Sequence, residues 1–208
     1  MSNIMDGNRT TKILALFDFD GTITTKDSLA EFIKFAVGNK TYYMGLLRLS
    51  MILISYTLKI LPNDKAKEKL ISHFFSGWDI NKFQKIARQY SSKKIGKIVR
   101  NKAIQKIKWH QRKGHKVVVV SASIECWLKV WCSNNNIELI STKLEIKDSV
   151  LTGKFSSKNC YGIEKVNRIK EKYDLDDYSY IYAYGDSNGD KELLSLANES
   201  FYKPFRDS

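Results

Sequence analysis

Three short apolar runs along the chain each end at a polar residue, and this pattern predicts buried parallel strands. The runs are residues 13–19, which end in acidic residues, residues 117–120, which end at Ser121, and residues 180–184, which end before Asp186. Continuous apolar runs of this length are typical of strands covered on both faces. Because ligands bind at the carboxyl ends of strands in open α/β sheets, the three polar strand ends predict a single functional site.

The segments between these runs have the periodicity of amphipathic helices. In residues 124–134 the apolar side chains of one helix face are Ile124, Trp127, Leu128 and Trp131. Further helices are expected at residues 101–113 and 162–173, and further strands at residues 138–146, 150–155 and 200–205, with a hairpin turn at Asp148–Ser149. These elements predict the α/β fold class, with a Rossmann-like parallel sheet flanked by helices.

The interval between the first two apolar runs predicts an insertion. From residue 27 to residue 116 the chain is much longer than a crossover between parallel strands needs. Residues 28–98 contain few turn signals, and we expect them to form a helical cap. The catalytic core is then expected to consist of residues 1–27 and 99–208.

Two pairs of aspartates follow the first and third apolar runs. In the DFDGT sequence at residues 18–22, Asp18 and Asp20 are two positions apart, a spacing that puts both side chains on one face of an extended strand. The GDSNGD sequence at residues 185–190 adds Asp186 and Asp190. Two carboxylates about 4 Å apart repel by about 4 kcal/mol at an effective dielectric constant of about 20, and a cation relieves this repulsion. Oxygen ligands without histidine or cysteine favour Mg²⁺ over zinc.

With these motifs the chain resembles the haloacid dehalogenase superfamily over nearly its whole length. The DFDGT sequence, Ser121 after a strand, Lys165 and the GDSNGD sequence match the four motifs of that superfamily in order. The SAS triplet at residues 121–123, the NCYGIEKV stretch at residues 159–166 and the helical insertion are similar to one branch. That branch contains phosphoserine phosphatases and phosphatidylglycerophosphatase-like enzymes.

The resemblance implies a phosphatase in which Asp18 attacks phosphorus and forms an aspartyl phosphate. Asp20 would protonate the leaving oxygen and then activate a water molecule for the second step. Dehalogenases of the superfamily lack an acid two residues after the nucleophile. The presence of Asp20 therefore favours phosphoryl transfer over dehalogenation.

The same resemblance implies the ligands of the metal and of the phosphate. Mg²⁺ is expected to bind Asp18, the carbonyl oxygen of Asp20, and Asp186, while Asp190 orients these ligands. The phosphoryl oxygens are expected to contact three side chains, those of Ser121, Lys165 and Thr22.

Two further positions, Asp27 and Ala122, are expected to contact the substrate. For Asp27, the N-cap of the first cap helix is an equally strong alternative. Phosphoserine phosphatases carry SGG at the position of the SAS triplet and an asparagine at the position of Gly189. No cap arginine stands out as a ligand for an amino-acid carboxylate. Phosphoserine is therefore not the expected substrate.

The distribution of positive charge along the chain bears on which partners the protein binds. The chain has a formal net charge of +13, and the excess lies between Lys82 and Lys116, where there is no acidic residue. This basic segment either attracts anions or forms a solvated lysine-rich face. It contains few aromatic residues for base stacking, so no nucleic-acid partner is expected.

The sequence thus predicts a Mg²⁺-dependent phosphomonoesterase acting on a small phosphorylated metabolite. The alternative is a phosphatase of a membrane-associated lipid or glycan phosphate, because the apolar stretch 41–61 and the basic segment would suit an anionic membrane surface. The apolar composition of the stretch 41–61 is explained equally well if these residues form the core of the cap. A non-catalytic anion-binding module is a third candidate.

The three cysteines form neither a disulfide framework nor a zinc pattern, and the first ten residues lack the apolar segment of a signal peptide. A cytoplasmic location, with or without peripheral membrane association, is expected. The sequence makes no prediction of oligomeric state.

Overall fold

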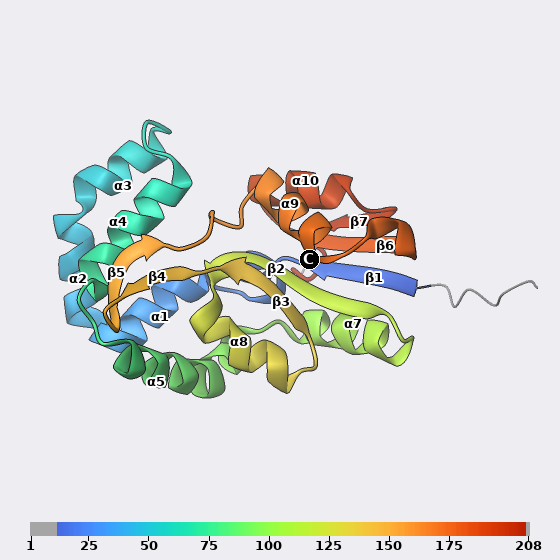
Figure 1. Ribbon diagram of the computed structural model, residues 1–208, viewed down its shortest axis with the longest axis horizontal. Helices are drawn as coiled ribbons and strands as arrows, with labels where there is room; N and C mark the ends of the chain where they lie inside the picture. The colour runs from blue at the N-terminus through green and yellow to red at the C-terminus, as the bar shows by residue number, and fades with distance from the viewer. Residues whose placement is uncertain (1–11, 207–208) are drawn as a thin grey trace, which may run out of the picture.

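A computed structural model describes residues 12–206 of the chain, and a five-stranded parallel sheet lies at its centre (Figure 1). The strand order is β3-β2-β1-β6-β7, and all neighbouring pairs are parallel. The strands are β1 (Lys12–Phe17), β2 (Lys116–Ile124), β3 (Glu138–Thr142), β6 (Tyr178–Gly185) and β7 (Glu199–Tyr202). This sheet confirms the predicted α/β class. Residues 1–11 of the expected core lie outside the described residues.

The centre of the sheet is apolar on both faces, as the continuous apolar runs predict. Phe17 and Val119 belong to the core cluster on one face, and Leu16 and Val118 belong to the cluster on the other. Alternate residues of a strand point to opposite faces, so a strand buried on both sides must be apolar at every position. In the register of the sheet, Phe17 lies opposite Val119 on β2 and Tyr184 on β6. The polar residues after these three strands are therefore brought to one edge.

Helices cover both faces of the sheet (Figure 1). Helices α9 (Ile163–Lys172) and α10 (Lys191–Ser195) lie on one face, and α7 (Asn101–Arg112) and α8 (Glu125–Asn134) lie on the other. The segments with helical periodicity thus form helices. Trp127 and Leu128 of α8 are buried, as the spacing of its apolar residues predicts.

The segment expected to be one strand over residues 138–146 forms two strands. β3 ends in the main sheet, whereas β4 (Leu144–Lys147) pairs antiparallel with β5 (Val150–Phe155) in a separate hairpin. Between them, the Lys143 N–H donates to Ser157 Oγ at 3.0 Å. β5 packs against α4 (Asn63–Phe75) so closely that a Cβ on Gly153 would lie 2.6 Å from Ser72 Cβ.

Helices fill the interval between β1 and β2. In chain order they are α1 (Ser28–Val37), α2 (Asn39–Arg48), α3 (Ser50–Thr57), α4, α5 (Ile80–Tyr90), the short α6 (Gly96–Ile98) and α7. Phe32 of α1 stacks on Trp127 of α8 with ring centroids 4.5 Å apart, and meets Phe83 and Tyr90 of α5 edge to face. This aromatic cluster holds α1 and α5 to the sheet layer. By contrast, α3 contributes no buried residue.

The helical insertion leaves and rejoins the sheet region through two adjacent backbone segments. The Thr25 N–H donates to the Ile98 carbonyl oxygen at 2.7 Å, and the Arg100 N–H donates to the Ile23 carbonyl oxygen at 2.8 Å. The two ends of the insertion therefore lie side by side. In the part of the chain from residue 12 to residue 206, none of the helices has the length and apolarity that crossing a bilayer requires.

His110 of α7 is fully buried against the sheet. Its Nε2 lies 2.9 Å from the Tyr184 hydroxyl, and its Nδ1 lies 2.8 Å from Nδ1 of His115. Burial lowers the pKa of His110 to about 3, and the charges of His115 and Lys106 add to this effect. A proton on His110 is therefore incompatible with the folded state near neutral pH.

We expect His110 to make the protein less stable as the pH falls below 6.5. The unfolded chain takes up a proton at His110 near pH 6.5, whereas the folded chain keeps it neutral down to about pH 3. The unfolded state thus binds more protons in this window, so the free energy of unfolding decreases on acidification. Urea unfolding at about pH 7 and about pH 4 should give a smaller pH dependence for His110→Gln than for wild type. The exposed His73 supplies the control, because His73→Gln should keep the wild-type pH dependence.

Candidate active site

The end of β1 carries Asp18 to the sheet edge where the strand ends meet. Its backbone N–H donates to the Tyr184 carbonyl oxygen of β6 at 2.9 Å, which extends the pairing of the two strands by one residue. Burial raises the pKa of Asp18 to about 7, although the ammonium group of Lys165 opposes the rise. The chain then turns at Gly21, where φ is +84° and a Cβ would lie 2.8 Å from Cγ of Asp186. A glycine there allows the loops after β1 and β6 to approach each other.

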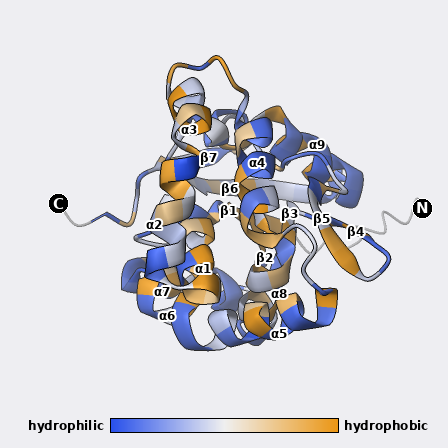
Figure 2. Cartoon of the chain, turned by 90° about the vertical axis from the view of Figure 1, so that its left-hand side faces the viewer, coloured by the Kyte–Doolittle hydropathy of each residue, from blue (hydrophilic) through white to orange (hydrophobic). Residues whose placement is uncertain are grey.

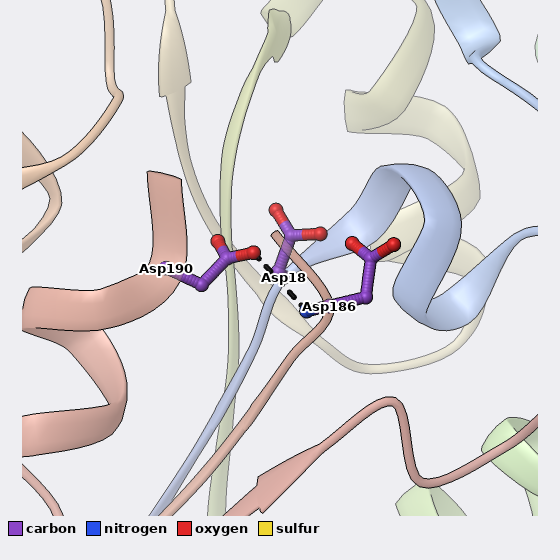
Figure 3. Close-up of side chains that lie close together, drawn as sticks. All are labelled: Asp18, Asp186 and Asp190. Atoms are coloured by element: carbon purple, nitrogen blue, oxygen red, sulfur yellow. Dashed lines mark hydrogen bonds between the residues drawn. The ribbon is translucent and has the colours of Figure 1, made fainter. Parts of the chain in front are cut away.

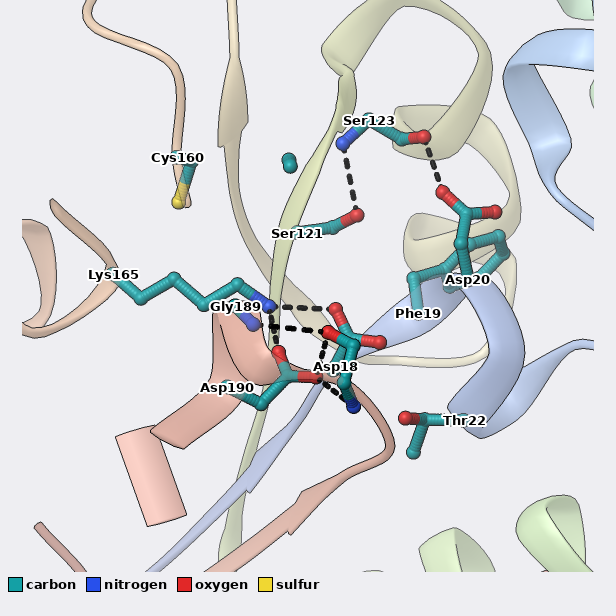
Figure 4. Close-up of polar contacts among 12 residues, drawn as sticks. Asp18, Phe19, Asp20, Thr22, Ser121, Ser123, Cys160, Lys165, Gly189 and Asp190 are labelled. Atoms are coloured by element: carbon teal, nitrogen blue, oxygen red, sulfur yellow. Dashed lines mark hydrogen bonds and ion pairs between the residues drawn. The ribbon is translucent and has the colours of Figure 1, made fainter. Parts of the chain in front are cut away.

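Lys165 is the centre of a buried ionic cluster (Figure 4). Its Nζ donates to Asp18 Oδ1 and to Asp190 Oδ1, both at 2.6 Å, and the residue is 1% exposed. Lys165 lies in the first turn of α9, and the Gly162 N–H just before that helix donates to the Gly189 carbonyl oxygen at 3.0 Å. Burial alone would lower the pKa of Lys165, but the two carboxylates outweigh burial and raise it. The lysine is therefore charged.

Asp190 uses its second oxygen to hold the loop after β6. Its Oδ2 accepts hydrogen bonds from the Asp186 N–H at 3.1 Å, the Ser187 N–H at 3.0 Å and the Ser187 hydroxyl at 2.8 Å. Burial raises the pKa of Asp190, but Lys165 and these donors outweigh burial and lower it overall. The ionised Asp190 thus connects Lys165 to the loop that carries Asp186.

Three carboxylates from two strand ends surround one point (Figure 3). One oxygen atom each of Asp18, Asp186 and Asp190 lies within 4.8 Å of the others. The Thr22 hydroxyl donates to Asp186 Oδ1 at 3.3 Å, and Arg206 Nη2 pairs with Asp186 Oδ2 at 2.7 Å. The hard oxygen donors of the cluster fit a divalent ion such as Mg²⁺, whereas the guanidinium group of Arg206 occupies one of these oxygens.

Asp20 is held apart from the three carboxylates, beside the C-terminal end of β2 (Figure 4). Its Oδ1 accepts a hydrogen bond from the Ser28 N–H at 2.7 Å, and its Oδ2 accepts one from the Ser123 hydroxyl. Burial raises the pKa of Asp20 to about 6, and the charge of Asp27 adds to the rise, whereas the Ser123 hydrogen bond opposes it. A carboxyl group with this pKa can hold or release a proton near neutral pH.

The C-terminal part of β2 brings Ser121 and Ala122 to the same edge. The buried Ser121 accepts a hydrogen bond at Oγ from the Ser123 N–H at 3.0 Å. The Ala122 carbonyl oxygen accepts one from Lys67 Nζ of α4 at 3.2 Å. Burial lowers the pKa of Lys67, and the negative charges of Asp27 and Asp20 oppose this effect. Lys67 therefore faces the edge of the sheet where the strand ends meet.

Asp27 is the N-cap of α1, since its Oδ1 accepts a hydrogen bond from the Ala30 N–H at 2.9 Å. The capping alternative is thus present in the structure. The charge of Asp27 also affects the pKa of both Asp20 and Lys67, so this residue borders the site as well.

Sequence reasoning does not single out three side chains that contact the site residues, namely Lys67, Ser123 and Arg206. Lys67 is one of several alternating lysines in α4, and Arg206 follows the last strand without a motif. Ser123 could have been found, because it is two residues after Ser121 in an extended segment and so shares its face.

We expect Arg206→Ala to strengthen the binding of a divalent cation. The guanidinium group of Arg206 occupies Asp186 Oδ2, so an incoming ion competes with it. Because a partly exposed ion pair is worth up to about 1 kcal/mol, the dissociation constant for Mg²⁺ should fall by up to about fivefold. Isothermal titration calorimetry measures this change, and Arg112→Ala on the exposed side of α7 is the control. Unchanged or weaker binding in Arg206→Ala would contradict the competition.

Comparison with known proteins gives matches over nearly the whole chain. A protein-family model described as haloacid dehalogenase-like hydrolase matches residues 15–195. Protein CicA from Caulobacter vibrioides is 32% identical over 196 residues, which cover 93% of this chain and 87% of CicA. A probable phosphatase from Mycobacterium tuberculosis is 27% identical over 199 residues, which cover 92% of this chain and 69% of that protein.

A substrate-bound phosphoserine phosphatase complex has a similar fold. Its TM-score is 0.63 at 20% sequence identity, and the similarity covers 92% of this chain and 86% of that one. The family model confirms the resemblance to the haloacid dehalogenase superfamily that the four motifs predict, and the phosphatase structure shows that the fold is shared.

Proposed function

The chain belongs to the haloacid dehalogenase-like hydrolases, and from this membership we propose that it is a Mg²⁺-dependent phosphomonoesterase of a small phosphorylated metabolite. The observation that carries the proposal is the contrast between two carboxyl groups. Asp18 is buried beside the ammonium group of Lys165, whereas Asp20 is held separately by Ser28 and Ser123. Environments that separate two carboxyl groups in this way assign them different roles, one as nucleophile and one as acid and base.

In the proposed first step, an Asp18 oxygen attacks the phosphorus atom of the substrate. The bond between this oxygen and phosphorus forms as the bond from phosphorus to the leaving oxygen breaks, and Asp20 gives its proton to the leaving oxygen. An aspartyl phosphate and an alcohol result. The position of Asp20 supports this role, because Ser28 and Ser123 hold its carboxyl group apart from Lys165 and from the three clustered carboxylates.

In the proposed second step, Asp20 takes a proton from a water molecule whose oxygen attacks the same phosphorus atom. The bond between Asp18 and phosphorus breaks, inorganic phosphate leaves, and Asp20 is again protonated. The phosphoryl oxygens are held by Ser121 and Lys165, with Thr22 beside them. Lys165 Nζ lies 2.6 Å from Asp18 Oδ1, so a phosphoryl group on that carboxylate would remain next to the ammonium.

We propose that Asp18, Asp186 and the carbonyl oxygen of Asp20 hold Mg²⁺, and that Asp190 orients them. The proposal is supported by the group of three carboxylates, one oxygen of each lying within 4.8 Å of the others. When bound, the ion supplies positive charge that screens the approach of an anionic nucleophile to an anionic phosphate.

The proposed cap comprises residues 28–98, and the proposed core comprises residues 1–27 and 99–208. The leaving group would contact Lys67 of the cap, and it would also contact Asp27 and Ala122, which border the site where the core faces the cap.

The proposed location is the cytoplasm, which suits the free cysteines Cys126, Cys132 and Cys160.

A phosphate-release assay tests the proposal. We expect hydrolysis of one or more sugar phosphates, phosphoamino acids or nucleotides with Mg²⁺, loss of hydrolysis with excess chelator, and recovery when Mg²⁺ is restored. Asp186→Ala should lose activity in the same assay, because an octahedral site tolerates little loss of ligands. Asp176→Ala, which changes an exposed aspartate just before β6, at the opposite end of that strand from Asp186, is the control. Full activity in the chelator would be incompatible with the proposed site.

The second candidate function, hydrolysis of a membrane-associated phosphate, is favoured by the absence of buried residues in α3. The substrate panel therefore includes phosphatidylglycerophosphate in vesicles. Release from the lipid together with none from the small esters would support this candidate over the first.

A further inference from the structure

The outer side of α2, α3 and the turn after α3 is apolar and exposed, and we call it the α2–α3 surface. Its large exposed side chains are Tyr43, Met44, Leu47, Met51, Ile54, Tyr56, Leu58 and Ile60. These are eight of the twelve large hydrophobic residues that are exposed between residues 12 and 206. Leu47, Met51 and Ile60 are 76%, 72% and 74% exposed. Folded proteins rarely expose so large a contiguous apolar surface without a partner.

The side chains of this surface are separate from those that pack α2 and α3 against the rest of the protein. Leu49 at the junction of α2 and α3 is 8% exposed, and Gly45 approaches Phe74 of α4 so closely that a Cβ on residue 45 would overlap the phenyl ring. The outward side chains take no part in these contacts. In Figure 1, α3 and the loop after it lie at the outer end of the insertion, away from the sheet. Figure 2 shows apolar segments on α2, α3 and this loop from the side that faces the viewer.

The charged residues within α2, α3 and the turn after α3 have one sign. No acidic residue occurs between Glu31 and Asp64, whereas Lys40, Arg48 and Lys59 are exposed in this interval. Apolar side chains flanked by cations are the composition of helices that lie in the interface of an anionic bilayer. Tyr43 and Tyr56 add the amphipathic rings that favour the headgroup region.

We infer that the α2–α3 surface docks on an anionic phospholipid bilayer. A symmetric contact with a second copy would bring the same cations of both copies together without an acidic partner, which disfavours that occupant. The helix α3 has eight residues and spans about 12 Å, against about 30 Å for the bilayer interior, so it lies on the membrane rather than across it.

A chain of polar contacts connects the docking surface to the candidate active site. Asn63 Nδ2 donates to the Tyr56 hydroxyl at 3.0 Å, and Asn159 Nδ2 donates to Asn63 Oδ1 at 2.9 Å. The Thr142 hydroxyl lies 3.2 Å from Asn159 Oδ1 and donates to the Ala122 carbonyl oxygen at 3.0 Å. A docked surface would thus hold the cap side of the site next to the membrane. The inference itself rests on exposure and charge, and it does not depend on the proposed reaction.

Co-sedimentation with vesicles tests the inference. The full chain is mixed with vesicles of phosphatidylcholine alone or of phosphatidylcholine with phosphatidylglycerol. We expect sedimentation with the anionic vesicles and much less with the neutral ones. Leu47→Gln combined with Met51→Gln should lower the partition coefficient at least about tenfold, because burial of one leucine-sized side chain is worth about that factor. Ile146→Gln, which changes an exposed apolar residue of the β4–β5 hairpin, is the matched control and should sediment like wild type.

A second variant keeps the test independent of any effect on folding. Replacement of Lys40, Arg48 and Lys59 by glutamine leaves the apolar side chains in place and should lower binding to anionic vesicles by about tenfold or more. Unfolding midpoints of both variants should match that of wild type, because the changed side chains are exposed. Absence of wild-type sedimentation, equal sedimentation with neutral vesicles, or equal sedimentation of all variants would overturn the inference. So would a concentration-dependent dimer in analytical ultracentrifugation that the Leu47 and Met51 changes disperse.

Discussion

The Asp18→Asn variant is expected to release phosphate at least about 10⁴-fold more slowly than wild type while keeping the wild-type fold. The amide has the shape of the carboxylate but is a poor nucleophile. Its loss of charge should cost little stability, because burial of the Asp18 charge outweighs the attraction of Lys165 and raises the pKa of this group to about 7. Steady-state phosphate release gives the rate, and urea unfolding gives the stability.

The control for this experiment is Asp177→Asn, which makes the same chemical change at an exposed residue paired with Lys12. This variant should retain wild-type turnover. In addition, acid quenching during turnover should trap phosphate on wild type and none on Asp18→Asn. Wild-type turnover in Asp18→Asn would rule out the nucleophile that we propose.

The Lys165→Met variant is expected to lose both activity and about 3–5 kcal/mol of unfolding free energy at neutral pH. Methionine fills a similar volume but leaves Asp18 and Asp190, both buried, without the ammonium group that each contacts at 2.6 Å. Removing one partner of a buried ionic cluster is far more costly than removing a surface pair, because the remaining charges cannot be solvated.

The pH dependence of this variant distinguishes an electrostatic cause from a loss of packing. In wild type, the lowered pKa of Asp190 contributes stability that is lost as the pH falls through that pKa. In Lys165→Met, burial without the cation raises the pKa of the carboxyl groups, so protonation on acidification should recover part of the lost stability. Lys170→Met on the exposed face of α9 is the control. A loss below about 1 kcal/mol, or a loss independent of pH, would contradict the role of the cluster.

The sheet and the motif residues are predictable from sequence because the relevant signals are local. The central strands are largely apolar runs, and each of the two aspartate motifs stands at the end of such a run. The position of a residue at a strand end, together with parallel pairing, is enough to bring Asp18 near Asp186 and Asp190. The hairpin turn at residues 148–149 is likewise found from its turn residues.

The features that sequence analysis does not find depend on packing between distant segments. Whether residues 138–146 form one strand or two is decided by pairing, since β3 joins the main sheet while β4 pairs with β5. Lys67 reaches the C-terminal end of β2 only because α4 packs there, and nothing distinguishes it locally from Lys65 or Lys69. Arg206 contacts Asp186 across an interval of twenty residues for the same reason.

The adjacent ends of the helical insertion have a consequence for how the chain folds. β1 and β2 are neighbours in the sheet, yet the whole insertion and α7 lie between them in the sequence. Pairing such distant strands directly requires closure of a long loop, and the entropy cost of closure rises with the logarithm of loop length. Helices form from local contacts and faster than long-range strand pairs.

Once the insertion is folded, its two ends lie within hydrogen-bond distance, at Thr25 with Ile98 and at Ile23 with Arg100. The folded insertion then adds little to the length of the loop that must close before β1 meets β2. That loop consists of the few residues after β1 and the segment through α7. The order of events that this connection favours is helical insertion first and central sheet second.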